Sequence, residues 1–306
     1  MGFFLKFKLT ILGSGGAIPT IEKRPTSQFL NIQERRFLID CGEGTQIQLR
    51  KFGCRFTKID HIFISHLHGD HYLGLIGLLS TFNLLGRINP IYIYAPKELE
   101  EILEMHFKIS GKPFRFNIEF HPLNFKNKAL IFEDTVLQVY SFPVSHSVPC
   151  CGFLFKEVKK SRNIIKTKIQ NKSIPFEKLK LLKEGKNVDF NNKILKYKDY
   201  TKDSPKPRSY AYCADTQYDE NLIPIISNVD LLYHEATFLE QMKERAKKTQ
   251  HSTAKDAATM AKEANTKRLI IGHFSARYNE IINFEKEAKT IFENTIAVND
   301  GDIFEI

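Results

Sequence analysis

The sequence lacks the features of membrane and secreted proteins. None of its apolar runs reaches the roughly 18 residues that a membrane-spanning helix needs. The longest candidate, Tyr72–Leu85, is interrupted by Ser80, Thr81 and Asn83. The N-terminal segment carries lysines inside its apolar run and has no small-residue cleavage site, so we do not expect a signal peptide. These absences predict a protein without a membrane partner.

The sequence is also poor in cysteine and has no nucleotide-binding fingerprint. Its five cysteines are an odd number without a C-x-x-C pair, which argues against a disulfide framework and against a cysteine zinc site. A reducing cytoplasm is therefore the expected location. The glycine-rich string Gly13–Gly16 is not followed by Lys-Ser or Lys-Thr and fits no dinucleotide motif. We interpret it as a tight turn between strands, and we expect no nucleotide cofactor.

Outside one segment, the sequence has no excess of positive charge. The whole chain has a formal net charge of +10. Between Phe153 and Arg208 there are 17 Lys and Arg against 6 Asp and Glu, so this segment carries +11 and the remainder −1. A lysine-rich proteome would enrich the whole chain, whereas clustered Lys and Arg are typical of a nucleic-acid partner. Because its apolar residues are sparse, we expect the segment to form a polyanion-binding arm that protrudes from the core.

The rest of the chain predicts a mixed α/β domain built from two similar halves. Expected strands are 7–12, 29–32, 37–39, 62–64, 91–94, 210–213, 231–233 and 269–271, and expected helices are 43–52, 72–85 and 97–107. A further helix should follow Thr253, which can cap it, with Asp256 in the first turn. Two such halves favour two sheets packed face to face with helices outside. We expect one domain, 1–306, with the basic arm inserted at about 153–208.

The string His66-Leu67-His68-Gly69-Asp70-His71 carries the most chemical information. It follows an apolar strand-like run and precedes an apolar helix. Four imidazole and carboxylate groups in six residues cannot be buried without hydrogen-bond partners or a metal. His66 and His68 alternate as the chain leaves the strand and so point to one side, whereas Asp70 and His71 can face a second ion. This donor set suits zinc or, less selectively, manganese, iron or nickel.

Three further metal-capable side chains follow strand-like runs. His146, Asp215 and His273 each lie just past such a run. In α/β folds, ligand sites usually gather at the carboxyl ends of strands. Taken together with the 66–71 string, these residues predict one shared metal centre rather than three isolated loop residues.

The pattern H-x-H-x-D-H at 66–71 resembles the signature of the metallo-β-lactamase superfamily. The resemblance implies an α/β fold, the four-layer αβ/βα sandwich, with a two-zinc site along one edge. It implies that one Zn²⁺ is held by His66, His68 and His146, the other by Asp70, His71 and His273, and that Asp215 bridges them. Position 68 is not the Glu of the di-iron oxidoreductase branch, so we do not expect a redox enzyme.

Five other strings resemble the ribonuclease Z family of tRNA 3′-processing endoribonucleases, in its short form. They lie at 13–20, 38–46, 234–238, 251–253 and 272–278. The resemblance implies hydrolysis of precursor tRNA that leaves a 3′-hydroxyl on the tRNA and a 5′-phosphate on the trailer. The basic segment falls where this family carries a flexible arm that grips tRNA. The interval between Asp215 and His273 is too short for the inserted domain of the β-CASP nucleases.

The chemistry needs groups beyond the metal ligands. The resemblance implies that Asp70 also accepts the proton of the attacking water. We expect Arg277 to clamp the scissile phosphate and His251 to protonate the departing 3′-oxygen. Glu235 would hold the other nitrogen of His251, although a buried structural contact explains this pair equally well.

The resemblance also implies a homodimer, in which the arm of one subunit lies over the active site of the other. One alternative function is a small-molecule ester, thioester or lactone hydrolase of the same fold, which would need no arm and would show no salt dependence. Another is a non-catalytic RNA-binding protein, which would lack metal ligands. All seven predicted ligands are present in this sequence.

Overall fold

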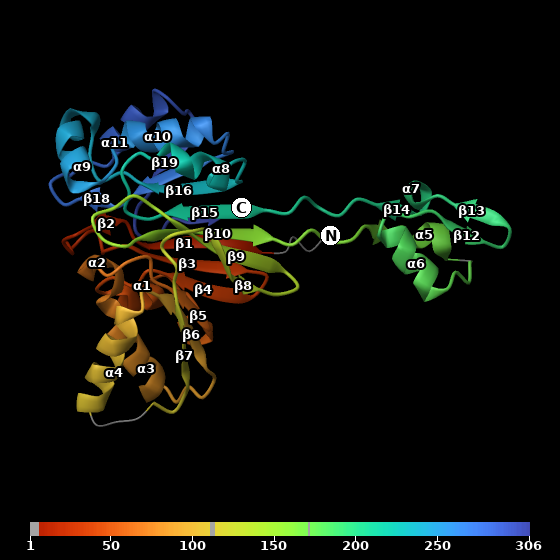
Figure 1. Cartoon of the computed structure of the whole chain (residues 1–306), viewed down its shortest axis with the longest axis horizontal. Helices are drawn as coiled ribbons and strands as arrows, with labels where there is room; N and C mark the ends of the chain where they lie inside the picture. Colours follow the sequence, from red (N-terminus) through yellow and green to blue (C-terminus); the bar gives the residue numbers. More distant parts are fainter. Residues whose placement is uncertain (1–5, 111–113, 171) are drawn as a thin grey trace. The chain divides into compact units, whose positions relative to one another are not determined.

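The computed structural model describes residues 6–110, 114–170 and 172–306. The backbone divides into two compact units. The larger, which we call the main unit, consists of Met1–Lys156 and Arg208–Ile306, and the smaller, which we call the arm, is Glu157–Pro207. Figure 1 shows the secondary structure of both units. Each unit is described by itself below.

The main unit is built on two sheets, each with seven strands among the described residues. The first sheet has the order β20 (Ile303–Glu305), β1 (Phe7–Gly13), β3 (Ser27–Ile32), β4 (Arg35–Ile39), β5 (His61–Phe63), β6 (Ile91–Ala95) and β7 (Ile118–Pro122). The second has the order β19 (Thr295–Ala297), β17 (Leu269–Gly272), β16 (Leu231–Glu235), β15 (Ser209–Cys213), β10 (Cys151–Glu157), β9 (Leu137–Pro143) and β8 (Ala129–Glu133). A third, two-stranded pairing joins β2 (Gly15–Gly16) to β18 (Phe274–Ser275).

Alternating burial along the strands explains why the two sheets pack face to face. Phe7, Leu9 and Ile11 of β1 belong to the same buried cluster as Tyr210 and Tyr212 of β15, because successive side chains of a strand point to opposite faces. The outer face of each sheet buries a second cluster under helices. In Figure 1, α1 (Thr45–Lys51), α3 (Gly74–Leu84) and α4 (Glu98–Ser110) lie by the first sheet, and α8 (Ile223–Ile226), α10 (Ala254–Glu263) and α11 (Ile282–Lys289) by the second.

The predicted start of helix α10 is confirmed. The Thr253 side chain accepts a hydrogen bond from the backbone N–H of Asp256, and the Asp256 carboxylate accepts one from the backbone N–H of Thr253. This reciprocal capping satisfies two backbone donors that a helix start leaves free. The remaining short helices of the main unit are α2 (Gly69–Tyr72), α9 (Lys243–Thr249), η1 (Phe56–Lys58), η2 (Glu220–Leu222) and η3 (Glu240–Met242). Among the described residues, we find no helix with the length and apolar character needed to cross a bilayer.

The expected helix 72–85 differs from the structure at its N-terminal end. Helix formation begins earlier, in the short helix α2, and α3 follows after Leu73. The backbone N–H of Gly74 donates to the carbonyl of Cys41, and a side chain at Gly74 would meet the backbone of Gly42. This close contact fixes the chain between the two helices. As a consequence, Asp70 and His71 belong to a helical turn that is tied to the end of β4.

The arm contains its own small apolar core. Its elements are β11 (Asn163–Ile164), α5 (Lys166–Ile169), α6 (Phe176–Lys183), β12 (Val188–Phe190), β13 (Lys193–Leu195), α7 (Tyr197–Tyr200) and β14 (Thr201–Lys202). Ile174, Leu182, Val188 and Leu195 are buried together. The sequence did not predict the pairing of β12 with β13.

Candidate metal centre

The predicted ligands lie at the carboxyl ends of strands from both sheets. His66 and His68 follow β5, and His146 follows β9. Asp215 follows β15, and His273 lies between β17 and β18. His273 has a φ of 62°, an uncommon backbone conformation for a residue with a Cβ, and the ring packs against Gly16, where a Cβ would come within 2.6 Å of it. The fold therefore brings together side chains that are more than 200 positions apart in the sequence.

One group of donors consists of His66, His68 and His146. The His66 Nε2 lies 3.1 Å from the His68 Nδ1, and the His146 Nε2 lies 3.2 Å from the same nitrogen. The Asp215 Oδ2 lies 3.7 Å from the His66 Nε2 and 3.8 Å from the His146 Nε2. These four residues offer one donor atom each to a common point.

A second group consists of Asp70, His71 and His273. The His273 Nε2 lies 3.3 Å from both the His71 Nε2 and the Asp70 Oδ2. The other oxygen of Asp215, Oδ1, lies 3.4 Å from the His71 Nε2 and 3.3 Å from the His273 Nε2. Asp215 therefore presents one oxygen to each group, as a bridging carboxylate would.

The spacing of the donor atoms suits coordination of metal ions better than direct hydrogen bonding among the side chains. A tetrahedral zinc ion with Zn–N bonds of about 2.0–2.1 Å separates two nitrogen ligands by about 3.3 Å, close to the spacings found here. The Asp215 Oδ1 is buried and accepts no hydrogen bond, and leaving a buried carboxylate oxygen without a partner is costly. Ions within the two groups would satisfy this oxygen and separate the crowded imidazole nitrogens.

Burial and charge in the site favour a neutral imidazole at His66 and an ionised carboxylate at Asp215, and they create a demand for positive charge. Burial lowers the pKa of His66 well below its usual value, which keeps the imidazole neutral and able to coordinate. Burial raises the pKa of Asp215, but His273 and His71 outweigh this effect and lower it strongly, so the carboxylate is ionised. Burial also lowers the pKa of His71, yet Asp215, Asp70 and Asp40 together raise it well above normal. Three carboxylates around one imidazole create a strong demand for positive charge, which a metal cation would meet.

The nitrogens that face away from the centre are held by residues that the sequence analysis did not assign. The His71 Nδ1 lies 2.8 Å from the Asp40 Oδ2, and the His273 Nδ1 lies 2.8 Å from the Thr237 Oγ1. Such partners fix the ring orientation of metal-binding histidines. Asp40 lies directly after strand β4, so its position at a strand end was a signal comparable to those of His146 and Asp215.

His251 and Glu235 lie beside the two ligand groups. The His251 Nδ1 is 2.7 Å from the Glu235 Oε1 and 3.9 Å from the Asp215 Oδ2. The ring of His251 stacks on that of His273, with centroids 5.4 Å apart. Burial lowers the pKa of His251, but the fully buried Glu235 carboxylate outweighs this and raises it to about 9. A raised pKa favours the protonated imidazole at neutral pH, which is the form that can donate a proton.

Arg277 lies at the surface near this pair without contacting the ligands. Its guanidinium stacks over Phe238 at 5.2 Å from the ring centroid, and its Nε donates to the Ser275 hydroxyl. Phe238 in turn packs edge-on against the ring of His251. Arg277 is exposed, and Phe238 is a ring neighbour of both Arg277 and His251.

The glycine-rich string is more than the turn that we expected. Gly15–Gly16 forms a short strand next to β18, and the backbone N–H of Ala17 donates to the Asp70 Oδ2 at 2.6 Å. A Cβ at Gly13 would collide with the carbonyl of Pro25. The string thus supports two predicted ligands, a role that depends on contacts distant in sequence.

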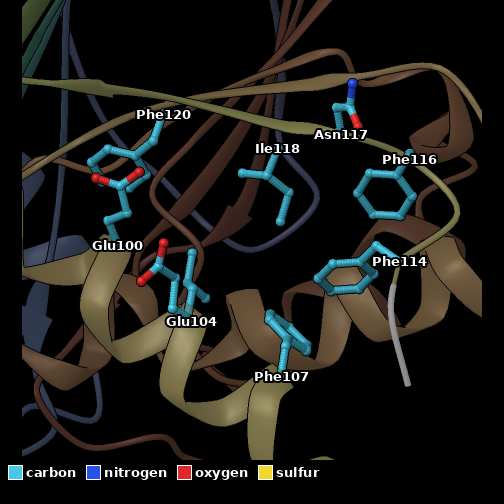
Figure 2. Close-up of a pocket in the computed structure, with 9 residues that line it drawn as sticks. Glu100, Glu104, Phe107, Phe114, Phe116, Asn117, Ile118 and Phe120 are labelled. Atoms are coloured by element: carbon cyan, nitrogen blue, oxygen red, sulfur yellow. The ribbon is translucent and has the colours of Figure 1, made fainter. Parts of the chain in front are cut away.

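A cavity of about 370 Å³ lies away from these residues, between α4 and β7. Figure 2 shows its lining, in which the rings of Phe107, Phe114 and Phe116 face Ile118, with Glu100 and Glu104 at one side. None of the predicted ligands lines it. The candidate chemistry therefore belongs to the polar centre at the strand ends.

Comparison with known proteins decides the family. Residues 7–160 match the family model described as Anti-Pycsar protein Apyc1, a range that ends before Asp215 and His273. Over nearly its full length, the chain is 43% identical to a ribonuclease Z of Bacteroides fragilis, across 97% of this chain and 98% of the relative. A ribonuclease Z of Parabacteroides distasonis is also 43% identical, across 96% and 97%. The chain belongs to the ribonuclease Z family.

Solved structures agree with this membership and confirm the predicted fold class. The human tRNase Z, short form, superposes with a TM-score of 0.71 at 26% identity, covering 97% of this chain and 98% of that one. A metallo-β-lactamase fold protein of Bacillus subtilis gives a TM-score of 0.70 at 19% identity, covering 98% and 100%. As a ribonuclease Z family member, the chain has the metallo-β-lactamase fold, and its His and Asp groups are suited to hold metal ions.

Proposed function

We propose that this protein is a zinc-dependent endoribonuclease that removes the 3′ trailer from tRNA precursors. The observation that carries the proposal is the convergence of two ligand groups on the two oxygens of Asp215 in a chain of the ribonuclease Z family. The products are a tRNA ending in a 3′-hydroxyl and a trailer beginning with a 5′-phosphate.

Two Zn²⁺ ions per subunit are the proposed cofactors. His66, His68 and His146 would hold one and Asp70, His71 and His273 the other, with Asp215 between them. Imidazole and carboxylate donors at these spacings are those that zinc prefers. When bound, the ions would supply a water nucleophile at neutral pH and polarise the phosphoryl oxygens.

The protein's own groups would then move protons and position the RNA. Asp70, oriented by the Ala17 N–H, is placed to accept a proton from water. His251, held by Glu235 and protonated at neutral pH, would donate a proton to the departing 3′-oxygen. The planar guanidinium of Arg277 would offer several N–H donors to the scissile phosphate. The Glu235–His251 distance of 2.7 Å supports the positioning role proposed for Glu235.

The arm is the proposed docking element for precursor tRNA. The segment from Phe153 to Arg208 carries a net charge of +11, whereas the remainder of the chain carries −1. Its compact unit is held by Ile174, Leu182 and their neighbours, so the lysines are carried on a folded scaffold rather than on a loose loop. Phosphate contacts made by such a cationic surface release counterions and strengthen RNA binding at low salt.

We further propose a homodimer that acts in the cytoplasm. Four large apolar side chains at the end of α3, in the segment that follows it and along α4 remain strongly exposed, with exposed fractions of 82% for Leu84, 76% for Ile88, 65% for Met105 and 80% for Ile109. A second copy of the chain would cover such a patch. All five cysteines are free thiols, which suits a reducing compartment.

A substrate comparison separates the proposed nuclease from a small-molecule hydrolase of the same fold. Purified, zinc-loaded protein is incubated with a 3′-extended precursor tRNA, an aryl thioester, a homoserine-type lactone and an aryl ester. The concentration of each substrate is varied, and each series is measured at two salt concentrations. The proposal predicts efficient, salt-sensitive cleavage of the RNA alone. Faster, salt-insensitive turnover of an ester, thioester or lactone would favour the alternative.

A further inference from the structure

A cationic cavity lies at the opposite end of β1 from the metal centre. Its volume is about 260 Å³, and Lys6, Lys8, Arg36 and Arg55 are among its lining residues. The ligand-bearing edge of the first sheet lies beyond Gly13, at the carboxyl end of the same strand. Lys6, at the far end of the lining, is seven residues of extended chain, roughly 20 Å, from Gly13, and none of the predicted ligands lines the cavity. The cavity is therefore no part of the centre described above.

Strand register places its polar groups in one row. Lys8 of β1 is directly opposite Asn31 of β3, and Asn31 is directly opposite Arg36 of β4. Directly opposed residues share a face of the sheet, so these three side chains project side by side. Lys6 is two residues from Lys8 and therefore projects to the same face.

Most of these cations have no ion-pair partner among the residues that the structure describes. Arg36 pairs with Glu34, the one acidic residue of the lining. Among the residues that the structure describes, we find no ion pair for Lys6, Lys8 or Arg55, although Glu305 is the cross-strand neighbour of Lys8 on β20. Outside the segment from Phe153 to Arg208 the chain has a net charge of −1, so the excess of positive charge at this cavity is local. Clustered like charges repel, and a bound anion would relieve that repulsion.

The remaining walls are suited to a ligand with an apolar part. Phe29 and Phe52 also line the cavity, and Phe52 is half-buried. In the row of side chains, Asn31 lies between Lys8 and Arg36, and its amide can hydrogen-bond to a ligand. Lys and Arg side chains bind phosphate, and aromatic rings such as that of Phe52 can stack on nucleobases. We propose that this cavity is a second anion site, which takes a nucleotide phosphate together with its base.

Cys54 provides a local reporter for occupancy. It lines the cavity and is partly accessible, whereas Cys41, Cys150, Cys151 and Cys213 are buried. Alkylation of the native full-length protein by N-ethylmaleimide, followed by peptide mass spectrometry, therefore measures access to this cavity. Phosphate that binds at the distant metal centre would not shield Cys54, so the readout separates the two places.

The rate of Cys54 alkylation is measured with inorganic phosphate, with AMP and with a five-nucleotide single-stranded RNA, against NaCl of equal ionic strength. At a ligand concentration ten times its dissociation constant, the rate should fall roughly tenfold. Protection by AMP equal to that by the oligonucleotide identifies a free nucleotide as the ligand, and protection by the oligonucleotide alone identifies an RNA backbone. Protection by phosphate alone, or by none of the three, overturns the proposal.

Charge variants test whether the named cations are responsible. Lys6→Glu combined with Lys8→Glu should abolish the protection, and the milder pair Lys8→Gln and Arg55→Gln should weaken it at least several-fold. Lys58→Glu is the matched control, because Lys58 is exposed on the neighbouring η1 and does not line the cavity. The ratio of rates with and without ligand is compared within each variant, since Lys8 itself influences the Cys54 thiol. Unchanged protection in both cavity variants would overturn the proposal. The proposal is independent of the nuclease function, and the variants should hydrolyse bis(p-nitrophenyl) phosphate at the normal rate.

Discussion

The Asp40 Oδ2 lies 2.8 Å from the His71 Nδ1, on the side of the imidazole that faces away from the proposed metal ions. Asp40 also accepts hydrogen bonds from the Ser65 N–H, the Ser65 hydroxyl and the Tyr212 hydroxyl. This carboxylate is fully buried and has a φ of 53°. A network of this kind holds the His71 ring in one orientation, so that its Nε2 points at the second ligand group.

Replacing Asp40 with Asn should therefore weaken metal binding without removing a ligand. The neutral amide cannot stabilise the His71 ring as the carboxylate does. Replacing a hydrogen-bond partner of this kind typically lowers metal affinity 10–100-fold. Zinc content after dialysis against a series of buffered zinc concentrations measures the effect. Asp60→Asn is a matched control, because Asp60 pairs with Arg87 on the surface. Equal zinc affinities for a folded Asp40→Asn variant and the parent protein would show that the network does not tune the site.

His251→Ala should lower the turnover of precursor tRNA by roughly two to four orders of magnitude while zinc content stays unchanged. Glu235→Gln should retain more activity than His251→Ala, but it should move the alkaline limb of the pH–rate profile to lower pH. The sign follows from the direction of the pKa shift: Glu235 raises the pKa of His251, so removing its charge lowers that pKa and the acid loses its proton earlier. Loss of zinc in His251→Ala would mean that His251 is a ligand or a structural residue.

Much of this site could be predicted from the sequence, because metal ligands need particular side chains at strand ends. The string from His66 to His71 is local, and the structure places His66 and His68 in one donor group and Asp70 and His71 in another. The contacts of Asp40, Thr237 and Ala17 could not be predicted, since each depends on a partner brought close by sheet packing. The same holds for Gly16, whose lack of a Cβ matters only because the ring of His273 lies against it.

The two-sheet arrangement was predictable for a similar reason. Short apolar runs bounded by turn residues specify strands, and two α/β halves have few ways to bury their faces. The break between α2 and α3 was not visible, because it depends on the contact of Gly74 with the end of β4. The small core of the arm was missed because its buried residues, such as Ile174 and Leu195, are spread thinly among lysines.

Removing the arm should separate RNA binding from hydrolysis. Lys156 of β10 pairs with Ser209 of β15, so replacing residues 157–208 with Asn-Gly should close these strands as a hairpin. The KM for precursor tRNA should rise strongly, whereas hydrolysis of bis(p-nitrophenyl) phosphate should change little. The intact enzyme should lose RNA affinity steeply with salt, with a slope of roughly −0.7 to −0.9 per phosphate contact, and the excised protein should lose that steepness. Equal salt slopes for the two proteins would exclude the arm as the docking element.

Mixed dimers test whether the arm of one subunit serves the active site of the other. Subunits without the arm are combined with subunits that carry Asp70→Ala, each with its own affinity tag, and mixed dimers are isolated through both tags. We expect part of the precursor-tRNA activity to return, since each mixed dimer contains one intact ligand set and one intact arm. Verified mixed dimers that remain inactive would indicate that arm and site act within one subunit.

The most direct test of the account is cleavage of a 3′-extended precursor tRNA labelled at both ends. Metal-depleted protein, protein reconstituted with zinc and reconstituted Asp70→Ala are compared, and the products are sized and their end groups determined. We predict one cut at the trailer junction, with a 3′-hydroxyl and a 5′-phosphate, by the reconstituted parent protein alone, while Asp70→Ala still retards the RNA in a gel shift. A ladder of shortened 3′ ends, cleavage that survives metal depletion, or full activity of Asp70→Ala would contradict the account.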